Sequence, residues 1–286
     1  MGLLDGKVAI ITGAGGGLGR SYALLLAKEG ASILVNDYGA SKDGSGPGTS
    51  EAALRVVDEI VSAGGKAAAN GSDVSTVEGG QQILQDALAA FGRVDILINN
   101  AGILRDKSFA KLEEPDWDAV VKVHLKGAYC VARPVFQWMK DNGQGGVIVN
   151  TTSSSGLGGS FGQANYAAAK MGVVGLSNTL AIEGKKFGIR VWTLAPAAAT
   201  RLVGDLIPDE LKAKWAPDHV APVMLYMVSS LSGERTGKIL FASGTKIKEI
   251  KLVGADGLDN GAGMTAADIA ASADKIFLPE STLSFD

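Results

Sequence analysis

The sequence predicts an α/β fold in which one domain contains a doubly wound parallel sheet of seven strands, with helices on both faces. The main observation is that short apolar runs alternate along the chain with longer segments of helical periodicity. The first run, Val8–Thr12 (VAIIT), shows no alternation of polar and apolar residues, which is typical of a strand buried on both faces. A glycine-rich turn at Gly13–Gly19 follows this run and leads into a helical pattern, as in a βαβ unit.

The remaining elements follow from the same alternation. We expect strands at Val8–Thr12, Ser32–Asn36, Ala67–Asn70, Asp95–Asn99, Gly146–Thr151, Ile189–Leu194 and Ile239–Ala242. Helical spacing predicts helices at Leu18–Glu29, Ser50–Ala63, Val77–Phe91, Asp116–Asp141 (with a kink at Pro134), Tyr166–Phe187 and His219–Ser229. The sheet is expected to end before residue 246. Residues 1–245 would then form the domain, and residues 246–286 a C-terminal tail or docking arm that is too short to bury its own core.

The composition disfavours several classes of function. The 286 residues carry a net charge of −3 and no basic cluster, so we expect no nucleic-acid partner. No apolar run approaches the ~20 residues of a membrane span, and the N-terminus lacks a signal-peptide pattern, so we expect no membrane partner and a cytoplasmic location. The single cysteine, Cys130, rules out an intrachain disulfide, and His124 and His219 lie far apart without a metal-binding motif, so no metal site is expected.

The glycine-rich turn predicts a dinucleotide site of the Rossmann type. A turn without side chains lets the backbone approach a pyrophosphate, whose charge is met by the free amides at the start of the next helix. Asp37 ends the second expected strand, 18 residues after Gly19, where its carboxylate can accept hydrogen bonds from both adenosine ribose hydroxyls. The turn carries no Arg or Lys for a 2′-phosphate, which favours NAD over NADP. The alternative is that Asp37 is an ordinary residue of a strand-end turn.

A serine, a tyrosine and a lysine are spaced as in a catalytic site. Lys170 follows Tyr166 by four residues on an expected helix, so both lie on one face, and Ser153 approaches from the end of the preceding strand. A phenol ionises near ~10, and an adjacent ammonium is expected to lower the pKa of Tyr166 towards the range of a general base. The alternative is a chance Tyr-x-x-x-Lys pattern in a helix.

With these motifs placed, the chain to about residue 245 resembles the short-chain dehydrogenase/reductase family. The resemblance rests on Thr12, Gly13, Gly17 and Gly19, on the segments Ser72–Val74 and Asn99–Gly102, and on Ser153, Tyr166 and Lys170. It implies that Asn99 and Lys170 hold the nicotinamide ribose and that the segment from Pro196 to Thr200 covers the nicotinamide. The full set of cofactor residues that it implies is Gly13, Gly17, Leu18, Gly19, Asp37, Asp73, Val74, Asn99, Ala101, Gly102, Tyr166, Lys170, Pro196 and Thr200.

His124 departs from the pattern of the wider family, which usually has Asn in a catalytic tetrad at the middle of this helix. The histidine could position a water that links Lys170 to solvent, or it could be a packed structural residue. Within the family, the segments NNAGILRDKSFAKL, KVHLKGAY and GSFGQANYAAAK look most like the (3R)-hydroxyacyl-CoA dehydrogenase module of peroxisomal multifunctional enzymes and its bacterial relatives. His124 is itself a feature of that group.

The narrower resemblance implies NAD-dependent oxidation of (3R)-3-hydroxyacyl-CoA to 3-ketoacyl-CoA, with an acyl-CoA or another small hydroxy or keto compound as substrate. Three alternatives stay open: a 3-oxoacyl-carrier-protein reductase, a dehydrogenase of steroid or cyclic alcohols, and a dinucleotide-sensing protein without chemistry. The substrate pocket is expected at residues 105–109 and 202–215, where Arg105, Lys107 and Lys111 form an acid-poor set that could meet CoA phosphates or simply be a solvated rim. The resemblance also implies a homodimer or homotetramer, with apolar stripes at Tyr129–Met139 and Met171–Ile182 as candidate contacts.

Overall fold

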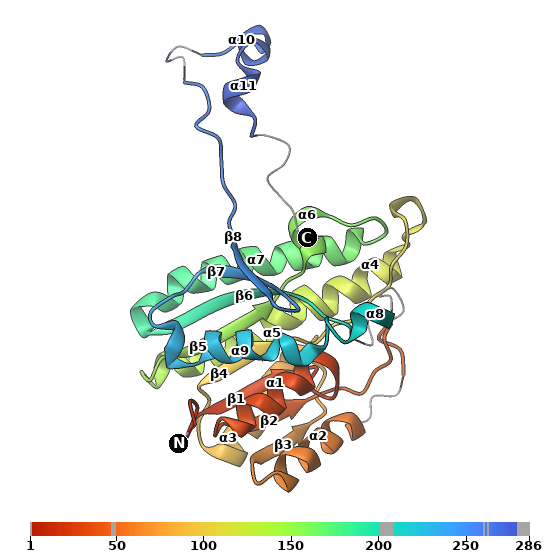
Figure 1. The fold of residues 1–286 in the computed structure, drawn as a ribbon, viewed down its shortest axis with the longest axis vertical. Helices are drawn as coiled ribbons and strands as arrows, with labels where there is room; N and C mark the ends of the chain where they lie inside the picture. Colours follow the sequence, from red (N-terminus) through yellow and green to blue (C-terminus); the bar gives the residue numbers. More distant parts are fainter. Residues whose placement is uncertain (1, 47–49, 201–208, 260, 262, 279–286) are drawn as a thin grey trace. The chain divides into compact units, whose positions relative to one another are not determined.

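The computed structural model describes residues 2–46, 50–200, 209–259, 261 and 263–278. It contains an eight-stranded sheet with the strand order β3-β2-β1-β4-β5-β6-β7-β8 (Figure 1). The strands are β1 (Val8–Thr12), β2 (Ser32–Asn36), β3 (Lys66–Asn70), β4 (Ile96–Asn99), β5 (Gly146–Thr151), β6 (Ile189–Ala197), β7 (Lys238–Ser243) and β8 (Lys246–Ile250). All pairings from β3 through to β7 are parallel, so the predicted doubly wound α/β fold is confirmed.

The eighth strand corrects the expectation that the sheet ends before residue 246. The turn between β7 and β8 has only two residues, Gly244 and Thr245, and such a short connection can join only antiparallel strands. Gly244 has a φ of 53°, a conformation that this tight turn requires and that glycine adopts without strain. Lys238 Nζ donates to Glu249 Oε1 at 3.0 Å across the pair. The sequence KIKEI gave no apolar run to indicate this strand, because it lies at an edge of the sheet and is largely exposed.

Helices cover both faces of the sheet (Figure 1). One face packs against α1 (Gly17–Lys28), α2 (Glu51–Ser62) and α9 (Ala221–Val228), and the other against α3 (Val77–Phe91), α5 (Gly127–Asp141) and α7 (Ala164–Gly184). Alternate strand residues supply the two cores: Ile11 of β1 belongs to the first and Ile10 to the second, as the period of two along a strand requires. Both are fully buried, which explains why the central strands read as continuous apolar runs.

The long helix predicted at Asp116–Asp141 is interrupted. The chain forms α4 (Glu114–Val121), a π-helical turn at Lys122–Lys126, and α5. The interruption lies upstream of Pro134, which is itself inside α5. A π turn inserts an extra residue into the helical register, and such turns are frequent at functional sites. Here the turn contains His124, whose side chain is buried.

The chain divides into two compact units, Met1–Glu249 and Ile250–Asp286. In the second unit, α10 (Ala266–Ala271) begins with a capping box, in which Thr265 Oγ1 accepts from the Asp268 amide at 3.2 Å, and α11 (Ala273–Ile276) follows. Several of its described apolar side chains, including Leu252 and Phe277, are exposed. A role for this unit as a docking arm stays a prediction.

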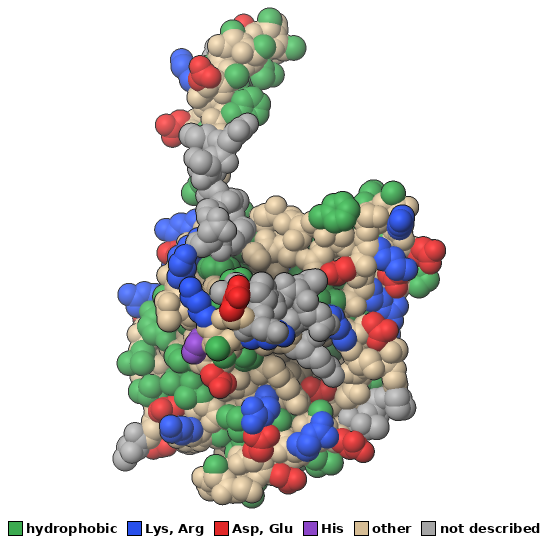
Figure 2. Space-filling view, turned by 45° about the vertical axis from the view of Figure 1, so that its right-hand side comes forward, with side chains coloured by type: hydrophobic (Ala, Val, Ile, Leu, Met, Phe, Trp, Pro, Cys, Tyr) green, Lys and Arg blue, Asp and Glu red, His purple; other side chains and the backbone are tan. Residues whose placement is uncertain are grey.

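Charged side chains of both signs are intermixed over the face of the first unit drawn in Figure 2. Within the described ranges, no helix is long and apolar enough to cross a bilayer. The described residues also contain no group of three or more His, Cys, Asp or Glu side chains that could hold a metal ion.

Candidate active site

The candidate site is a cleft of about 1170 Å³ along the carboxyl ends of the parallel strands. Residues that follow β1, β2, β4, β5 and β6 all line it, because parallel strands present their carboxyl ends at the same edge of the sheet. The strand order reverses between β1 and β4, and ligands of open α/β sheets bind at such a switch point. The fold therefore places the glycine turn and the Tyr166 helix in one cleft.

The glycine turn forms a cradle that side chains would fill. Gly13 has a φ of 64°, and a Cβ at this position would lie 2.7 Å from Ala101 Cα. A Cβ on Gly19 would collide with the Gly13 carbonyl oxygen. Helix α1 has no side-chain cap and no acidic residue in its first turn, so its first amides remain available to an anion. These features fit the pyrophosphate of a dinucleotide.

Asp37 lies at the end of β2 and faces this cradle. Its Oδ2 accepts a hydrogen bond from the Gly15 amide at 2.8 Å, and its Oδ1 accepts from the Gly39 amide at 2.8 Å. A Cβ on Gly15 would lie 2.7 Å from Asp37 Oδ2, so only glycine permits this approach. The carboxylate therefore borders the cleft beside the pyrophosphate cradle, where a 2′-phosphate would meet a like charge.

The end of β4 is tied to the end of β1. Thr12 Oγ1 accepts from the amides of Asn100 and Ala101 at 3.0 and 3.1 Å, and Asn100 Nδ2 donates to the Thr12 and Gly13 carbonyl oxygens. Asn99 turns the other way and donates to Asn150 Oδ1 at 2.9 Å. Asn100 thus connects the end of β4 to the end of β1, and Asn99 connects β4 to β5, so the pair holds three strand ends together beside the cleft.

Ser153, Tyr166 and Lys170 meet at the cleft. Ser153 begins the short helix α6 (Ser154–Gly158), while Tyr166 and Lys170 lie on one face of α7, as their spacing predicts. Lys170 Nζ lies 5.6 Å from the centre of the Tyr166 ring and donates to the Thr151 carbonyl oxygen at 2.6 Å. Lys170 is held in turn by Thr152, whose Oγ1 donates to the Lys170 carbonyl oxygen at 2.7 Å.

Burial dominates the proton affinities of the site. Loss of water raises the pKa of Tyr166 to about 12, and a hydrogen bond with Ser153 opposes this rise. The carboxylate of Asp106 adds to the rise. Burial also lowers the pKa of Lys170 to about 7. The expected lowering of the Tyr166 pKa by Lys170 is therefore absent in this structure, because desolvation disfavours the charged form of both groups.

His124 packs against the catalytic candidates. Its ring makes an edge contact with Tyr166 at 5.0 Å between centroids, and a Cβ on Gly102 would collide with the ring. The Nε2 atom lies 2.8 Å from the Ile103 carbonyl oxygen, while Nδ1 has no partner among the described residues. Burial, followed by the charge of Lys170, holds the pKa of His124 well below its usual range. The neutral ring is thus favoured beside Lys170.

A small cavity of about 10 Å³ lies next to His124. His124, Lys170, Asn99 and Thr151 are among the residues that line it. Two buried polar atoms without a described partner, His124 Nδ1 and Thr151 Oγ1, belong to these lining residues. A polar cavity of this size is near the minimum for one water molecule.

Most of the expected site residues meet in the cleft. Its lining includes Gly13, Gly17, Leu18, Asp37, Asp73, Val74, Ala101, Gly102, His124, Ser153, Tyr166, Lys170, Pro196 and Thr200. Gly19 is instead packed beneath the turn, and Asn99 lines the small cavity. Arg105, Asp106 and Trp215 line the expected substrate end, while residues 201–208 and 47–49 lie outside the described residues.

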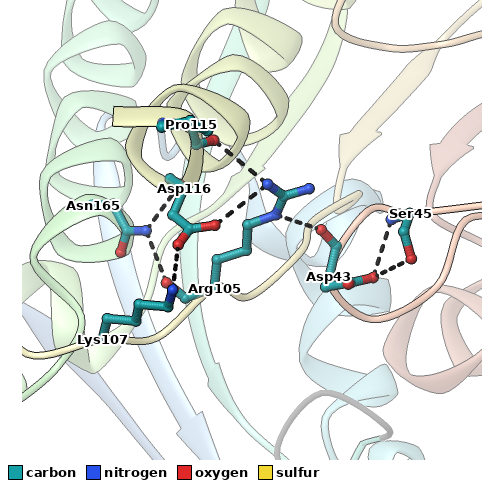
Figure 3. Close-up of polar contacts among 7 residues, drawn as sticks. All are labelled: Asp43, Ser45, Arg105, Lys107, Pro115, Asp116 and Asn165. Atoms are coloured by element: carbon teal, nitrogen blue, oxygen red, sulfur yellow. Dashed lines mark hydrogen bonds and ion pairs between the residues drawn. The ribbon is translucent and has the colours of Figure 1, made fainter. Parts of the chain in front are cut away.

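The expectation of an acid-poor set beside the cleft is wrong for two of its three cations, Arg105 and Lys107. Arg105 Nη1 lies 3.4 Å from Asp116 Oδ1, and Lys107 Nζ lies 3.1 Å from Asp116 Oδ2 (Figure 3). Both cations therefore share one carboxylate at the start of α4. The sequence does not reveal this pairing, because Asp116 lies in a different segment and its position predicts only the start of a helix.

Sequence reasoning missed Asn165 and Gln163, and it placed Asp106 in the pocket segment without a role of its own. Gln163 Nε2 donates to Asp106 Oδ2 at 2.7 Å, and fully buried Asn165 hydrogen-bonds to the backbone of three segments. The one available signal was the pair of carboxamide residues, Gln163 and Asn165, directly before Tyr166 at the start of a helix.

A dinucleotide cradle beside a converging serine, tyrosine and lysine defines an oxidoreductase site on a doubly wound sheet. A family model described as short chain dehydrogenase matches residues 7–210. The chain belongs to the short-chain dehydrogenase/reductase family.

Several relatives narrow this placement. The chain is 47% identical over 233 residues to the peroxisomal multifunctional enzyme type 2 of Mus musculus, covering 82% of this chain and 31% of that enzyme. It is 35% identical over 261 residues to a hydroxyacyl-CoA dehydrogenase of Mycobacterium tuberculosis, covering 85% and 79% of the two chains. A crystal structure of a short chain dehydrogenase from Mycobacterium avium matches with a TM-score of 0.86 and 38% identity over 98% of both chains. The expected resemblance to peroxisomal multifunctional enzymes and bacterial relatives is confirmed, although the chain spans only about a third of the mouse enzyme.

Proposed function

We propose that this protein is an NAD-dependent dehydrogenase that oxidises (3R)-3-hydroxyacyl-CoA to 3-ketoacyl-CoA. The observation that carries the proposal is the convergence of Ser153, Tyr166 and Lys170 beside the glycine cradle. Tyr166 takes the proton of the substrate hydroxyl, and Ser153 orients the reacting oxygen. Bound NAD would supply a positively charged acceptor for the hydride that leaves the carbon bearing the hydroxyl. Asn99 and Lys170 would hold its nicotinamide ribose, and residues 196–200 would cover its nicotinamide.

The pKa of about 12 keeps the Tyr166 phenol protonated at neutral pH in this structure. A protonated phenol is suited to donate a proton to a ketone, so the same site can run the reaction as a reduction. Oxidation requires positive charge near the phenolate. Among the described contacts, the cation beside the Tyr166 ring is Lys170, whose Nζ lies 5.6 Å from the ring centre. The ammonium form of Lys170 thus has an electrostatic role as well as a binding role.

For His124 we propose both roles that the sequence left open. The ring packs on Tyr166, and His124 lines the small cavity together with Lys170, while its buried Nδ1 has no hydrogen-bond partner among the described residues. A water held there would accept or donate a hydrogen bond at Nδ1 and support proton exchange by Lys170.

Other enzymes of the family would use the same residues on different substrates. A 3-oxoacyl-carrier-protein reductase and a dehydrogenase of steroid or cyclic alcohols are separated from the proposed function by the substrate test below. A dinucleotide-sensing protein without chemistry is disfavoured, because the complete set of Ser153, Tyr166 and Lys170 lies in the cleft. A homodimer or homotetramer stays a prediction. Much of the stripe at Tyr129–Met139 packs in the core, while Tyr129 and Ile182 are exposed.

We expect NAD to be preferred over NADP by at least tenfold in kcat/KM, which corresponds to about 1.4 kcal/mol. The physical reason is repulsion between Asp37 and a 2′-phosphate. Asp37→Ala should lower the ratio of kcat/KM with NAD to kcat/KM with NADP. Asp58→Ala, which removes the same charge from an exposed position on α2, should leave it unchanged. Equal efficiency with NADP in the wild-type protein would contradict the cofactor assignment.

We expect (3R)-3-hydroxybutyryl-CoA to be oxidised at least 100-fold more efficiently than its (3S) isomer or free (3R)-3-hydroxybutyrate. Tyr166, Ser153 and the cofactor together determine the positions of the oxygen and of the departing hydride, so only one enantiomer directs its thioester arm along the cleft. Steady-state kinetics with all three compounds test this. Similar values for the three would leave only the general dehydrogenase assignment standing.

A further inference from the structure

The residue directly before Tyr166 makes three hydrogen bonds from a fully buried position. Asn165 Oδ1 accepts from the Tyr166 amide at 2.8 Å. Asn165 Nδ2 donates to the carbonyl oxygens of Arg105 and Asp116, each at 3.1 Å. Figure 3 shows the Asn165 amide directed at the backbone of both residues. One side chain thus joins the start of α7, the start of α4 and the loop that follows the Asn-Asn-Ala-Gly motif.

That loop, residues 104–107, is held at both ends. The Leu104 amide donates to the Lys42 carbonyl oxygen at 3.0 Å, and Arg105 Nε donates to the Asp43 carbonyl oxygen at 2.8 Å. The Lys107 amide donates to the Gly162 carbonyl oxygen at 2.9 Å. The loop therefore bridges the glycine-rich segment that follows β2 and the segment that precedes α7. Asn165 contacts it at the centre.

We propose that Asn165 is a positioning residue for the reaction proposed above, because it sets the backbone of Tyr166 relative to the substrate loop. Arg105 and Asp106 of this loop line the cleft, so a shift between the loop and α7 changes the space between the phenol and the substrate. Gln163 supports the same alignment by donating to Asp106 Oδ2 at 2.7 Å. A misplacement of about 1 Å at a reacting group can cost ~100-fold in rate.

The chemistry of the contacts requires an amide rather than another side chain. Two carbonyl oxygens need two N–H donors, and the Tyr166 amide needs an acceptor, so the carboxamide satisfies all three backbone groups. Asn165→Asp keeps the acceptor for the Tyr166 amide and adds negative charge that favours a helix N-terminus. It also replaces the two N–H donors that face the Arg105 and Asp116 carbonyl oxygens with an oxygen that can only accept. Asn165→Asp therefore separates a role in starting α7 from a role in holding the loop.

The test compares Asn165→Asp and Asn165→Leu with the wild-type protein. We expect both to lower kcat for (3R)-3-hydroxybutyryl-CoA with NAD at least tenfold, while the Kd for NADH, measured by fluorescence, changes less than threefold. We also expect amide hydrogen exchange of residues 103–108 to become at least tenfold faster in both. If Asn165→Asp keeps the wild-type kcat and the wild-type amide exchange rates of residues 103–108, the proposal is overturned. Asn165 would then be needed only as the hydrogen-bond acceptor at the start of α7.

Ser232→Ala is the matched control. Ser232 is also fully buried, and its Oγ donates towards the Met227 and Ser229 carbonyl oxygens. The same oxygen accepts from Arg190, which lies near the amino end of β6, whereas the cleft lies at the carboxyl ends of the strands. Ser232→Ala should lower the Tm without lowering kcat. If kcat instead falls in step with Tm in all three variants, Asn165 acts only through stability and the proposal is wrong. If the wild-type protein does not turn over this substrate, the proposed function fails, but the exchange measurement still decides the role of Asn165.

Discussion

Tyr166→Phe is expected to lower kcat by about 10²- to 10⁴-fold, the range that a general acid–base group contributes. The variant removes only the phenolic oxygen, while the ring keeps its edge contact with His124. NADH affinity should therefore change less than a few fold. Single-turnover kinetics with (3R)-3-hydroxybutyryl-CoA measure the chemical step directly and avoid a limit set by product release.

Tyr22→Phe is the control for this prediction. Tyr22 is fully buried in α1, and its hydroxyl has no partner within the described ranges. The substitution removes the same atom from the core and should leave kcat within twofold. If Tyr166→Phe keeps a third of the wild-type rate of the chemical step, the proton-transfer role of Tyr166 is wrong.

Lys170→Met is expected to abolish turnover and to stabilise the fold at low pH. Lys170 is buried, and its pKa falls from 10.5 to about 7 through desolvation, which corresponds to a cost of about 5 kcal/mol for the ammonium form. The lost hydrogen bond to the Thr151 carbonyl oxygen offsets about 1–2 kcal/mol of the gain. We therefore expect the free energy of unfolding to rise by about 3–4 kcal/mol at pH 6.

The pH dependence has a definite sign. Between pH 7 and 10.5 the unfolded state binds the Lys170 proton and the folded state has lost it, so the free energy of unfolding of the wild-type protein rises with pH in this window. Below pH 7 both states are protonated and the cost is constant. The stability advantage of Lys170→Met should thus be largest at pH 6 and vanish towards pH 10. Denaturant unfolding at pH 6, 8 and 10 tests this, and a constant difference between the two proteins would contradict it.

Local sequence patterns predicted the central sheet well. The ranges expected for β1, β2 and β5 match those observed, because each strand is buried on both faces and its residues are apolar for that reason. The edge strand β8 was missed for the converse reason: its side chains are largely exposed, so its sequence contains no apolar run. Similarly, a helical pattern indicates the segment 116–141, but periodicity over so few residues does not reveal the single extra residue of a π turn.

Short-range spacing by itself determined the dinucleotide cradle and the face shared by Tyr166 and Lys170, because a turn, a strand end and a helical repeat are local geometries. The tertiary structure alone decided the pairing of Asp116 with two cations, the three contacts of Asn165, and the pKa values of Tyr166 and Lys170. These features depend on segments that are distant in sequence and on the exclusion of water, and desolvation can outweigh the attraction between neighbouring charges once the chain has closed around them.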